Sequence, residues 1–282
     1  RRETSTDAGA GEGLPRPTTT GGQMFLDPHY PISPSTSRAL GAGAVLVVLA
    51  AWAGVTGAGL VTPAFLPAPW SVLSALGRLA ADGTLLEAFL WSSSRVAVAT
   101  CLVVLIGVPV GVLMGSSPYI NAALSPLVDP FRSAPLVATL PLFVMWFGID
   151  ETMKIAFLWM GSVVYLVPMV RDAIKAVPSD HIIMSQDIGG SQLEIVWHTI
   201  FPIAKPRIVD AIIVSIGIEW TYITVAEYVN SKQGLGMIIQ NGKRLSAPDQ
   251  VFGGILIILA IALIVDKVLR AAKNYLYPWE TE

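Results

Sequence analysis

The chain has 282 residues, of which 53% are hydrophobic and only 13% are charged, whereas soluble domains carry about 25% charged residues. Its mean hydropathy is +0.62, and its uncharged stretches reach the about 20 apolar residues that one helical membrane span needs. The net charge of −2 and the lack of a basic patch argue against a nucleic-acid partner. The composition therefore predicts an all-α polytopic membrane protein with about six transmembrane helices in a lipid bilayer.

The N-terminal third begins with a segment that differs from the rest. Residues 1–37 are rich in Gly, Thr, Pro and charge, so they cannot bury a core and are expected to be a disordered cytoplasmic tail. The first transmembrane helix is expected at 38–60. Residues 61–89 are expected outside the membrane, on the periplasmic or extracellular side. There a Pro-rich stretch leads into apolar residues at helical spacing, which predict one amphipathic helical stretch over 71–90.

The main transmembrane core is expected over 90–270, followed by a cytoplasmic C-terminal tail at 271–282. The five expected spans lie at about 90–114, 127–147, 154–170, 208–228 and 251–268. The second of these five contains prolines at Pro130, Pro135 and Pro141. Prolines are tolerated in a span only where neighbouring helices or a cavity satisfy the freed carbonyl groups.

The orientation of the chain follows from the Lys and Arg residues that flank the spans, since cytoplasmic loops carry the excess. With the N-terminus inside, the inner flanks hold Arg38, Arg171, Lys175, Lys205, Arg207, Lys267, Arg270 and Lys273. The outer flanks hold Arg78, Lys154, Lys232, Lys243 and Arg244. This difference predicts a cytoplasmic N-terminus and places the long polar loop 171–207 in the cytoplasm.

The polar loop 171–207 contains two helix signals separated by a break. Ser179 and Asp180 follow a proline and can cap a short helix that runs to about residue 188. Gly189 and Gly190 then end this helix, because glycine readily adopts a positive φ. The loop therefore begins with a short helix and a sharp turn.

A second helix is predicted after the turn. Ser191 and Glu194 form the S-x-x-E capping box that starts a helix. Its apolar residues recur at i, i+3, i+4 and i+7 and form one stripe: Leu193, Val196, Trp197 and Ile200. Pro202 and Pro206 are expected to end the helix. The pattern predicts a helix pair on the cytoplasmic face, which either tethers the loop to lipid headgroups or binds a soluble partner.

The spacing Gly-x(12)-Pro from Gly189 to Pro202 resembles the cytoplasmic "EAA" loop of permease subunits of type I ABC importers. Further motifs follow the order of the nitrate, sulfonate, taurine and bicarbonate branch of these binding-protein-dependent systems. These motifs are Phe65-Leu66-Pro67-Ala68-Pro69, Ser94-Arg95-Val96, Trp146-Phe147-Gly148-Ile149, Ala226-Glu227 and Gly234-Leu235-Gly236. The chain departs from the family where Ile183-Met184-Ser185 replaces Glu-Ala-Ala, although Asp187 and Glu194 lie nearby.

The resemblance implies a permease subunit that imports a small solute, with a sulfonate, nitrate or taurine-like anion favoured, across the bacterial inner membrane. It implies a second permease copy (a homodimer), two cytoplasmic ATPase subunits and an external substrate-binding protein. The helix pair would then dock on the ATPase through Asp187, Gly189, Gly190, Ser191, Glu194, Trp197 and Pro202. The chain lacks the G-x-x-x-x-G-K-[ST] phosphate loop. We therefore expect no enzyme activity and no cofactor in this chain, with ATP and Mg²⁺ on the ATPase.

Four polar residues in or near the spans are candidates for the translocation path: Arg95, Glu219, Tyr222 and Glu227. Intramembrane charges are costly and usually face a bundle interior or a watery path. Alternatively, Glu219 is neutral or pairs with an arginine of the spans, and Arg95 extends to the interface as a structural residue. Two carboxylates facing a dimer axis would disfavour an anion pore. His29, His181 and His198 lack metal-ligand spacing, so no metal is expected.

Two other function classes fit the sequence less well. A proton-coupled secondary transporter could use Glu219, but such proteins often contain inverted repeats, and the two halves of this chain do not match. A membrane-embedded enzyme would need a nucleophile, base or metal ligands within the spans. The spans contain no histidine and only one cysteine, Cys101, which argues against that class.

Overall fold

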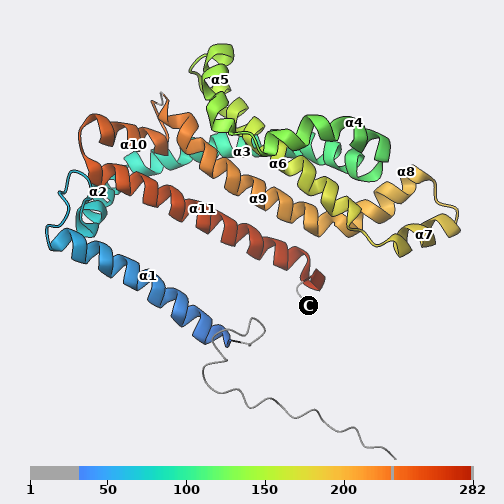
Figure 1. Ribbon diagram of the computed structural model, residues 1–282, viewed down its shortest axis with the longest axis horizontal. Helices are drawn as coiled ribbons and strands as arrows, with labels where there is room; N and C mark the ends of the chain where they lie inside the picture. The colour runs from blue at the N-terminus through green and yellow to red at the C-terminus, as the bar shows by residue number, and fades with distance from the viewer. Residues whose placement is uncertain (1–31, 230–231, 281–282) are drawn as a thin grey trace, which may run out of the picture. The chain divides into compact units, whose positions relative to one another are not determined.

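The computed structural model describes residues 32–229 and 232–280, and the regular elements within these ranges are all helices (Figure 1). Five helices are long and apolar enough to cross a membrane, or six when a bent helix pair counts as one span. The predicted all-α polytopic fold is thereby confirmed. The chain divides into two units, Arg1–Ala51 and Trp52–Glu282, which are described separately.

Helix α1, Pro34–Gly57, supplies the described part of the first unit and the start of the second. It begins four residues before the expected position 38. The expected tail falls mostly on residues 1–31, which lie outside the described residues.

The amphipathic stretch expected over 71–90 is not one helix. Helix α2, Pro69–Ala81, and helix α3, Thr84–Ser116, are separated by Gly83, whose φ of +79° favours glycine. The Asp82 carboxylate accepts a hydrogen bond from the Thr84 amide at 3.0 Å, which satisfies one free N–H at the start of α3. The prediction of a continuous stretch was wrong because spacing alone did not reveal this turn.

The span expected at 127–147 is also broken. Its residues belong to α4 (Pro118–Val128), the 3₁₀ turns η1 (Asp129–Arg132) and η2 (Leu136–Thr139), and α5 (Leu140–Phe147). The two halves meet at an angle of 91°. Pro130 and Pro141 lie in the first turns of η1 and α5, where a missing N–H leaves no hydrogen bond unmade. The prolines therefore begin new segments here.

Helices α3, α6 (Glu151–Lys175) and α9 (Phe201–Tyr228) form the core of the second unit, and α3 packs most extensively against α6. Three glycines on α3, Gly107, Gly111 and Gly115, face α6 at every fourth residue. A Cβ on Gly111 would lie 2.6 Å from the Cβ of Val170. A residue with a side chain at position 111 would therefore force the backbones of α3 and α6 apart. Small residues at this spacing are typical of tight helix contacts in membranes.

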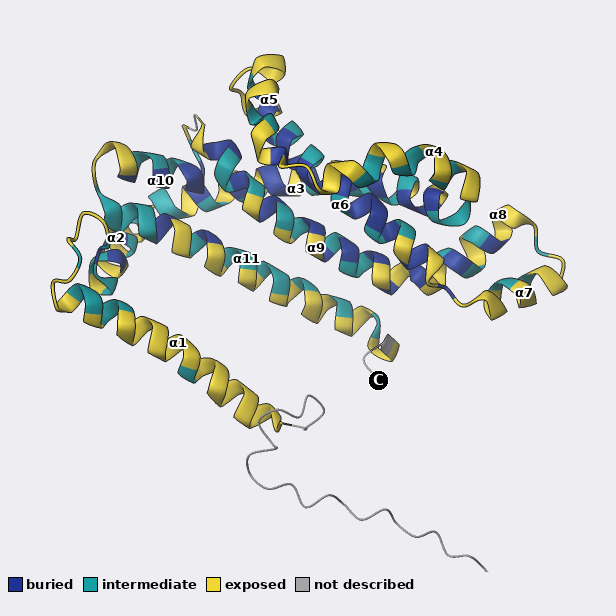
Figure 2. Ribbon diagram, in the orientation of Figure 1, coloured by how far each residue is buried: buried dark blue, intermediate teal, exposed yellow. Residues whose placement is uncertain are grey.

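Helices α10 (Leu235–Arg244) and α11 (Pro248–Leu276) complete the second unit, followed by the turn η4 (Pro278–Glu280). Buried residues follow the facing sides of α3, α6, α9 and α10, whereas α7 and the outer sides of α5 and α11 are largely exposed (Figure 2). Helix α10 and the hairpin of α7 and α8 lie at opposite ends of α9 (Figure 1). The unit thus has two distinct ends.

Candidate functional site

The loop predicted to be cytoplasmic forms a helical hairpin. Its first helix, α7, spans Ser179–Asp187. Pro178 occupies the N-cap position and no side chain caps the helix, so the expected capping role of Ser179 and Asp180 was wrong. Proline has no side-chain acceptor for the free N–H groups of the first turn, so on this exposed helix water can satisfy them.

The turn between the hairpin helices depends on two glycines. Gly189 has a φ of +86°, a conformation that costs other residues about 1–2 kcal/mol. The Gly190 amide donates a hydrogen bond to the Ser185 carbonyl at 3.0 Å, and a Cβ on Gly190 would lie 2.8 Å from that same oxygen. The shape of the turn therefore requires glycine at both positions.

The second helix of the hairpin, α8 (Gln192–Ile195), starts with the predicted capping box. The Glu194 carboxylate accepts from the Ser191 amide at 2.8 Å, and the Ser191 hydroxyl accepts from the Glu194 amide at 3.4 Å. The Ser185 and Thr199 hydroxyls, 2.9 Å apart, join the two arms of the hairpin. The hairpin is fixed by local hydrogen bonds.

The prolines do not end the second helix as expected. A π-helical turn, η3 (Val196–Ile200), connects α8 to α9, and the combined helix Gln192–Tyr228 is 37 residues long. In this turn the Phe201 amide donates to the carbonyl five residues earlier, at Val196. This wider turn carries the helix past Pro202, which lacks an N–H and lies in the first turn of α9. The second arm of the hairpin and the following span therefore form one continuous helix.

The predicted apolar stripe has two environments. Ile200 is 7% exposed and packs into the bundle, whereas Leu193 is 73% and Trp197 is 54% exposed. The hairpin also exposes three large apolar side chains of α7 and the turn. We call the five exposed residues the hairpin patch; they are Ile183, Met184, Ile188, Leu193 and Trp197. The hairpin thus presents apolar surface on a rigid frame, and the exposed Asp187 adds a negative charge.

Arg95 occupies the centre of a buried ionic cluster at the other end of the bundle. It is 2% exposed, and Nη1 donates to Glu227 Oε1 at 2.6 Å and to the Gln233 carbonyl at 2.9 Å. Nη2 donates to Glu151 Oε1 at 2.8 Å, and Glu151 also accepts from Lys154. The expectation that Arg95 extends to the interface was wrong, because its buried side chain meets the buried Glu227 carboxylate and the half-exposed Glu151 carboxylate.

Glu227 fixes the start of α10 within the same cluster. Its carboxylate accepts from the Ser92 hydroxyl at 2.7 Å and from the Gly236 amide at 2.8 Å. The Leu235 amide donates to the Ser92 hydroxyl at 2.9 Å. A Cβ on Gly234 would collide with the carboxylate of Glu227. We call Arg95, Glu151 and Glu227 with Ser92 the arginine cluster; it joins α3, α6, α9 and α10.

Glu219 lies apart from the arginine cluster, fully buried on α9. Thr100 of α3 donates a hydrogen bond to Oε2, while Oε1 has no partner among the described residues. The alternative that Glu219 pairs with an arginine of the spans was wrong, because Arg95 pairs with the other two carboxylates. Tyr222, one turn further on, packs edge-on against Phe157 at 5.5 Å.

The four path candidates therefore do not form one group. Arg95 and Glu227 meet, whereas Glu219 and Tyr222 belong to the packed interior. Sequence reasoning missed Glu151 and Ser92, the other members of the arginine cluster. Glu151 fell outside the span expected at 154–170, and its only signal was the i, i+3 spacing to Lys154. In the described part of the chain, no three His, Cys, Asp or Glu side chains lie together as a metal site would require.

Comparison with known proteins identifies relatives over most of the chain. Residues 107–279 match the profile of the family described as "Binding-protein-dependent transport system inner membrane component". The chain is 34% identical over 259 residues, 90% of its length and 94% of the relative's, to the taurine transport system permease protein TauC of Escherichia coli (strain K12). It is 29% identical to the putative aliphatic sulfonates transport permease protein SsuC of Bacillus subtilis (strain 168), covering 83% of this chain and 84% of that one.

A solved structure shares the fold. An inward-facing structure of the MetNI methionine ABC transporter aligns with a TM-score of 0.55 and 23% sequence identity. The alignment covers 67% of this chain and 95% of the chain in that structure.

Proposed function

Because the chain belongs to the family of binding-protein-dependent transport system inner membrane components, it is a permease subunit, and we propose that it imports a small sulfonate of the taurine type. The relatives named for taurine and for aliphatic sulfonates support this substrate class. ATP-driven import by an ABC transporter is the activity of this family.

The placement of the acidic residues supports an anionic substrate. Two carboxylates facing the path would repel a sulfonate. Glu219 and Glu227 are both fully buried in the chain, and Glu227 is paired with Arg95. Neither of these two carboxylates is exposed on the surface of this chain, and their burial supports the proposal of an anionic substrate.

The hairpin of α7 and α8 is the proposed docking element for the ATPase. The observation that carries this proposal is the hairpin patch, five large apolar side chains exposed on a hairpin whose turn is held in one shape by glycine and the capping box. Exposed apolar residues of this kind mark sites of protein contact. The proposed contact residues remain Asp187, Gly189, Gly190, Ser191, Glu194, Trp197 and Pro202.

The proposed assembly contains two copies of this chain, two ATPase subunits and one external binding protein. The Lys and Arg distribution supports a cytoplasmic N-terminus and a cytoplasmic hairpin. ATP and Mg²⁺ would bind to the ATPase, since this chain lacks a phosphate loop. Closure of the ATPase dimer would displace α8, and the continuous helix Gln192–Tyr228 would carry that displacement into the core of each permease.

Substitution at the hairpin turn tests the docking role. In Gly190→Ala, the new Cβ would lie 2.8 Å from the Ser185 carbonyl, so the turn must open. We expect the loss of ATP-driven uptake of radiolabelled taurine and of ATPase co-purification, with normal membrane insertion. Gly77→Ala is the matched control, because no atom lies within 4 Å of its Cβ position.

Two results would contradict the proposals separately. Normal uptake and normal ATPase retention in Gly190→Ala would refute the docking role of the hairpin. Taurine uptake that survives ATP depletion would refute the importer mechanism. Uptake that nitrate inhibits and unlabelled taurine does not would refute the sulfonate substrate alone.

A further inference from the structure

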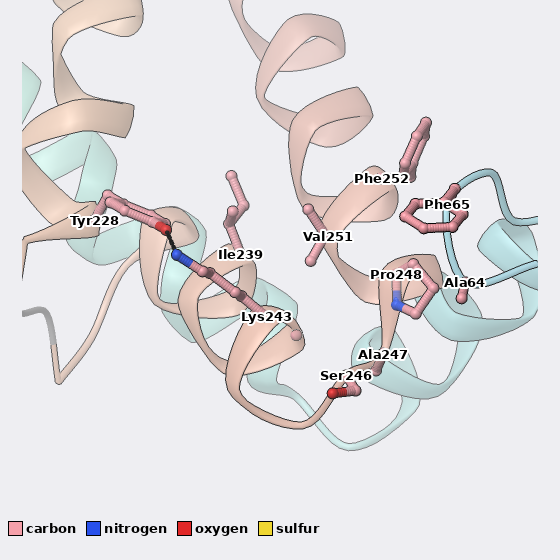
Figure 3. A pocket seen from close by; sticks show the side chains of 11 residues that line it. Ala64, Phe65, Tyr228, Ile239, Lys243, Ser246, Ala247, Pro248, Val251 and Phe252 are labelled. Atoms are coloured by element: carbon pink, nitrogen blue, oxygen red, sulfur yellow. Dashed lines mark hydrogen bonds between the residues drawn. The ribbon is translucent and has the colours of Figure 1, made fainter.

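A pocket lies at the end of the bundle opposite the hairpin, where α9 ends and α11 begins (Figure 3). Its volume is about 480 Å³, within the range of ligand-binding pockets. Residues from the segment before α2, the end of α9, α10 and the start of α11 line it: Ala64, Phe65, Tyr228, Ile239, Gly242, Lys243, Ser246, Ala247, Pro248, Val251 and Phe252. The ends of two spans place this pocket at the boundary between membrane and water.

One side of the pocket carries a positive charge that has no acidic partner among the residues the structure describes. Lys243 Nζ donates to the Tyr228 hydroxyl at 2.7 Å and lies 5.4 Å from the centre of that ring. An ammonium group has three N–H donors, so two remain for a ligand. None of the described residues that line the pocket is acidic. Asp249, which follows Pro248, pairs with Arg78 at 3.2 Å.

The other side of the pocket is apolar. Figure 3 shows the rings of Phe65 and Phe252 on the side of the pocket away from the Lys243 and Tyr228 pair. Phe65 is 80% exposed, so its ring is accessible to an apolar ligand. A ligand that covers this ring and meets Lys243 must have an anionic head and an apolar body. A small sulfonate would leave most of the apolar wall uncovered.

We propose that this pocket binds an anionic phospholipid of the surrounding bilayer. Its phosphate accepts hydrogen bonds from Lys243 and the Tyr228 hydroxyl, and the upper part of its acyl chains covers Phe65, Val251 and Phe252. Charge complementarity selects an anionic over a zwitterionic lipid, because a choline cation would find no acidic partner on the pocket wall. The site is separate from the hairpin and from the arginine cluster.

Lipid retention by the purified protein tests this proposal. The full chain, purified in detergent with the subunits that remain bound to it, is titrated with dioleoyl phosphatidylglycerol or dioleoyl phosphatidylcholine. Native mass spectrometry measures the bound lipid. We expect phosphatidylglycerol to bind in preference, and Lys243→Gln to weaken that binding about tenfold, as loss of one charge-assisted hydrogen bond does.

Two variants separate a specific site from general attraction. Arg244→Gln removes the same charge from the next residue, which does not line the pocket, and should retain binding. Val251→Trp fills the apolar side and should reduce binding of phosphatidylglycerol without any change of charge. Equal losses in Lys243→Gln and Arg244→Gln, or unchanged binding in Val251→Trp, would overturn the proposal. So would full competition by millimolar inorganic phosphate, which would indicate a site for free anions.

Discussion

The arginine cluster shows how a membrane protein can bury a full positive charge. Arg95 directs its donors at two carboxylates and one carbonyl, and Glu227 accepts further hydrogen bonds from Ser92 and the start of α10. Burying a charge is very unfavourable unless it is paired and hydrogen-bonded. The cluster is therefore sensitive to the loss of any one member.

Removal of the Glu227 carboxylate should destabilise the chain strongly. In Glu227→Ala, the buried Arg95 keeps Glu151 but loses its carboxylate partner at 2.6 Å, and the Ser92 hydroxyl and the Gly236 amide lose their buried acceptor. We expect a loss of about 3–5 kcal/mol, the usual effect of breaking a buried pair, seen as a lower Tm of the detergent-purified protein. The control is Arg270→Ala, whose ion pair with Asp266 is 48% and 39% exposed and should contribute at most about 1 kcal/mol. Similar Tm changes in both variants would contradict this assignment.

The effect of replacing Glu219 distinguishes an ATP-driven importer from a proton-coupled transporter. The side chain is fully buried against Thr100, so glutamine fits the same volume and still accepts the Thr100 hydrogen bond. We expect ATP-driven taurine uptake in Glu219→Gln to stay within about threefold of the original, a barrier change below about 1 kcal/mol. A proton-coupled mechanism that uses this carboxyl predicts complete loss of uptake, and such a loss would contradict our proposal.

The sequence indicated which residues carry polar chemistry, but not how they pair. Arg95 and Glu227 stood out because charges are rare in spans. Their contact depends on how α3 and α9 pack, and 132 positions separate them in the chain. Glu151 had only its i, i+3 spacing to Lys154 as a local signal, and Ser92 had none. Pairings of this kind are determined by tertiary packing, which hydropathy and spacing do not describe.

At the scale of helices, the close contact between α3 and α6 depends on glycine. In Gly111→Ala, the Cβ would lie 2.6 Å from the Val170 Cβ and 2.8 Å from the Val167 carbonyl oxygen. Because backbone atoms cannot rotate away, the helices must separate, and we expect a loss of about 1–3 kcal/mol. Thermal unfolding followed by circular dichroism measures this change, with Gly77→Ala as control. An unchanged or higher Tm in Gly111→Ala would contradict the packing argument.

The prolines show the limit of sequence reasoning at this scale. Long apolar runs correctly located α3, α6, α9 and α11, because length and hydropathy determine a span. Proline, however, can end a helix or occupy its first turn without cost. Pro202 was expected to end a helix and instead follows the π-helical turn η3. The span expected at 127–147 likewise became two segments at an angle of 91°.

At the scale of the whole molecule, the proposed topology places the hairpin and α10 on opposite sides of the membrane. Single cysteines introduced by Asp187→Cys and Arg244→Cys, in a Cys101→Ser background, test it. Both positions are exposed. A membrane-impermeant maleimide should label position 244 in intact cells and position 187 only in inverted vesicles. The reverse pattern would contradict the proposed cytoplasmic N-terminus and hairpin.

The continuity of the helix Gln192–Tyr228 has a mechanical consequence. At 37 residues it is about 55 Å long, well beyond the roughly 30 Å hydrocarbon thickness. The helix is not one straight rod, because α8 bends away from α9 at the π-helical turn η3 (Figure 1). Helix α9 alone has 28 residues and is about 42 Å long, so a tilt of about 10° displaces one of its ends by about 7 Å relative to the other, by the same geometry. With the hairpin docked as proposed, we expect α9 to act as a lever whose outer end carries the arginine cluster, so that leverage would connect the two faces of the membrane.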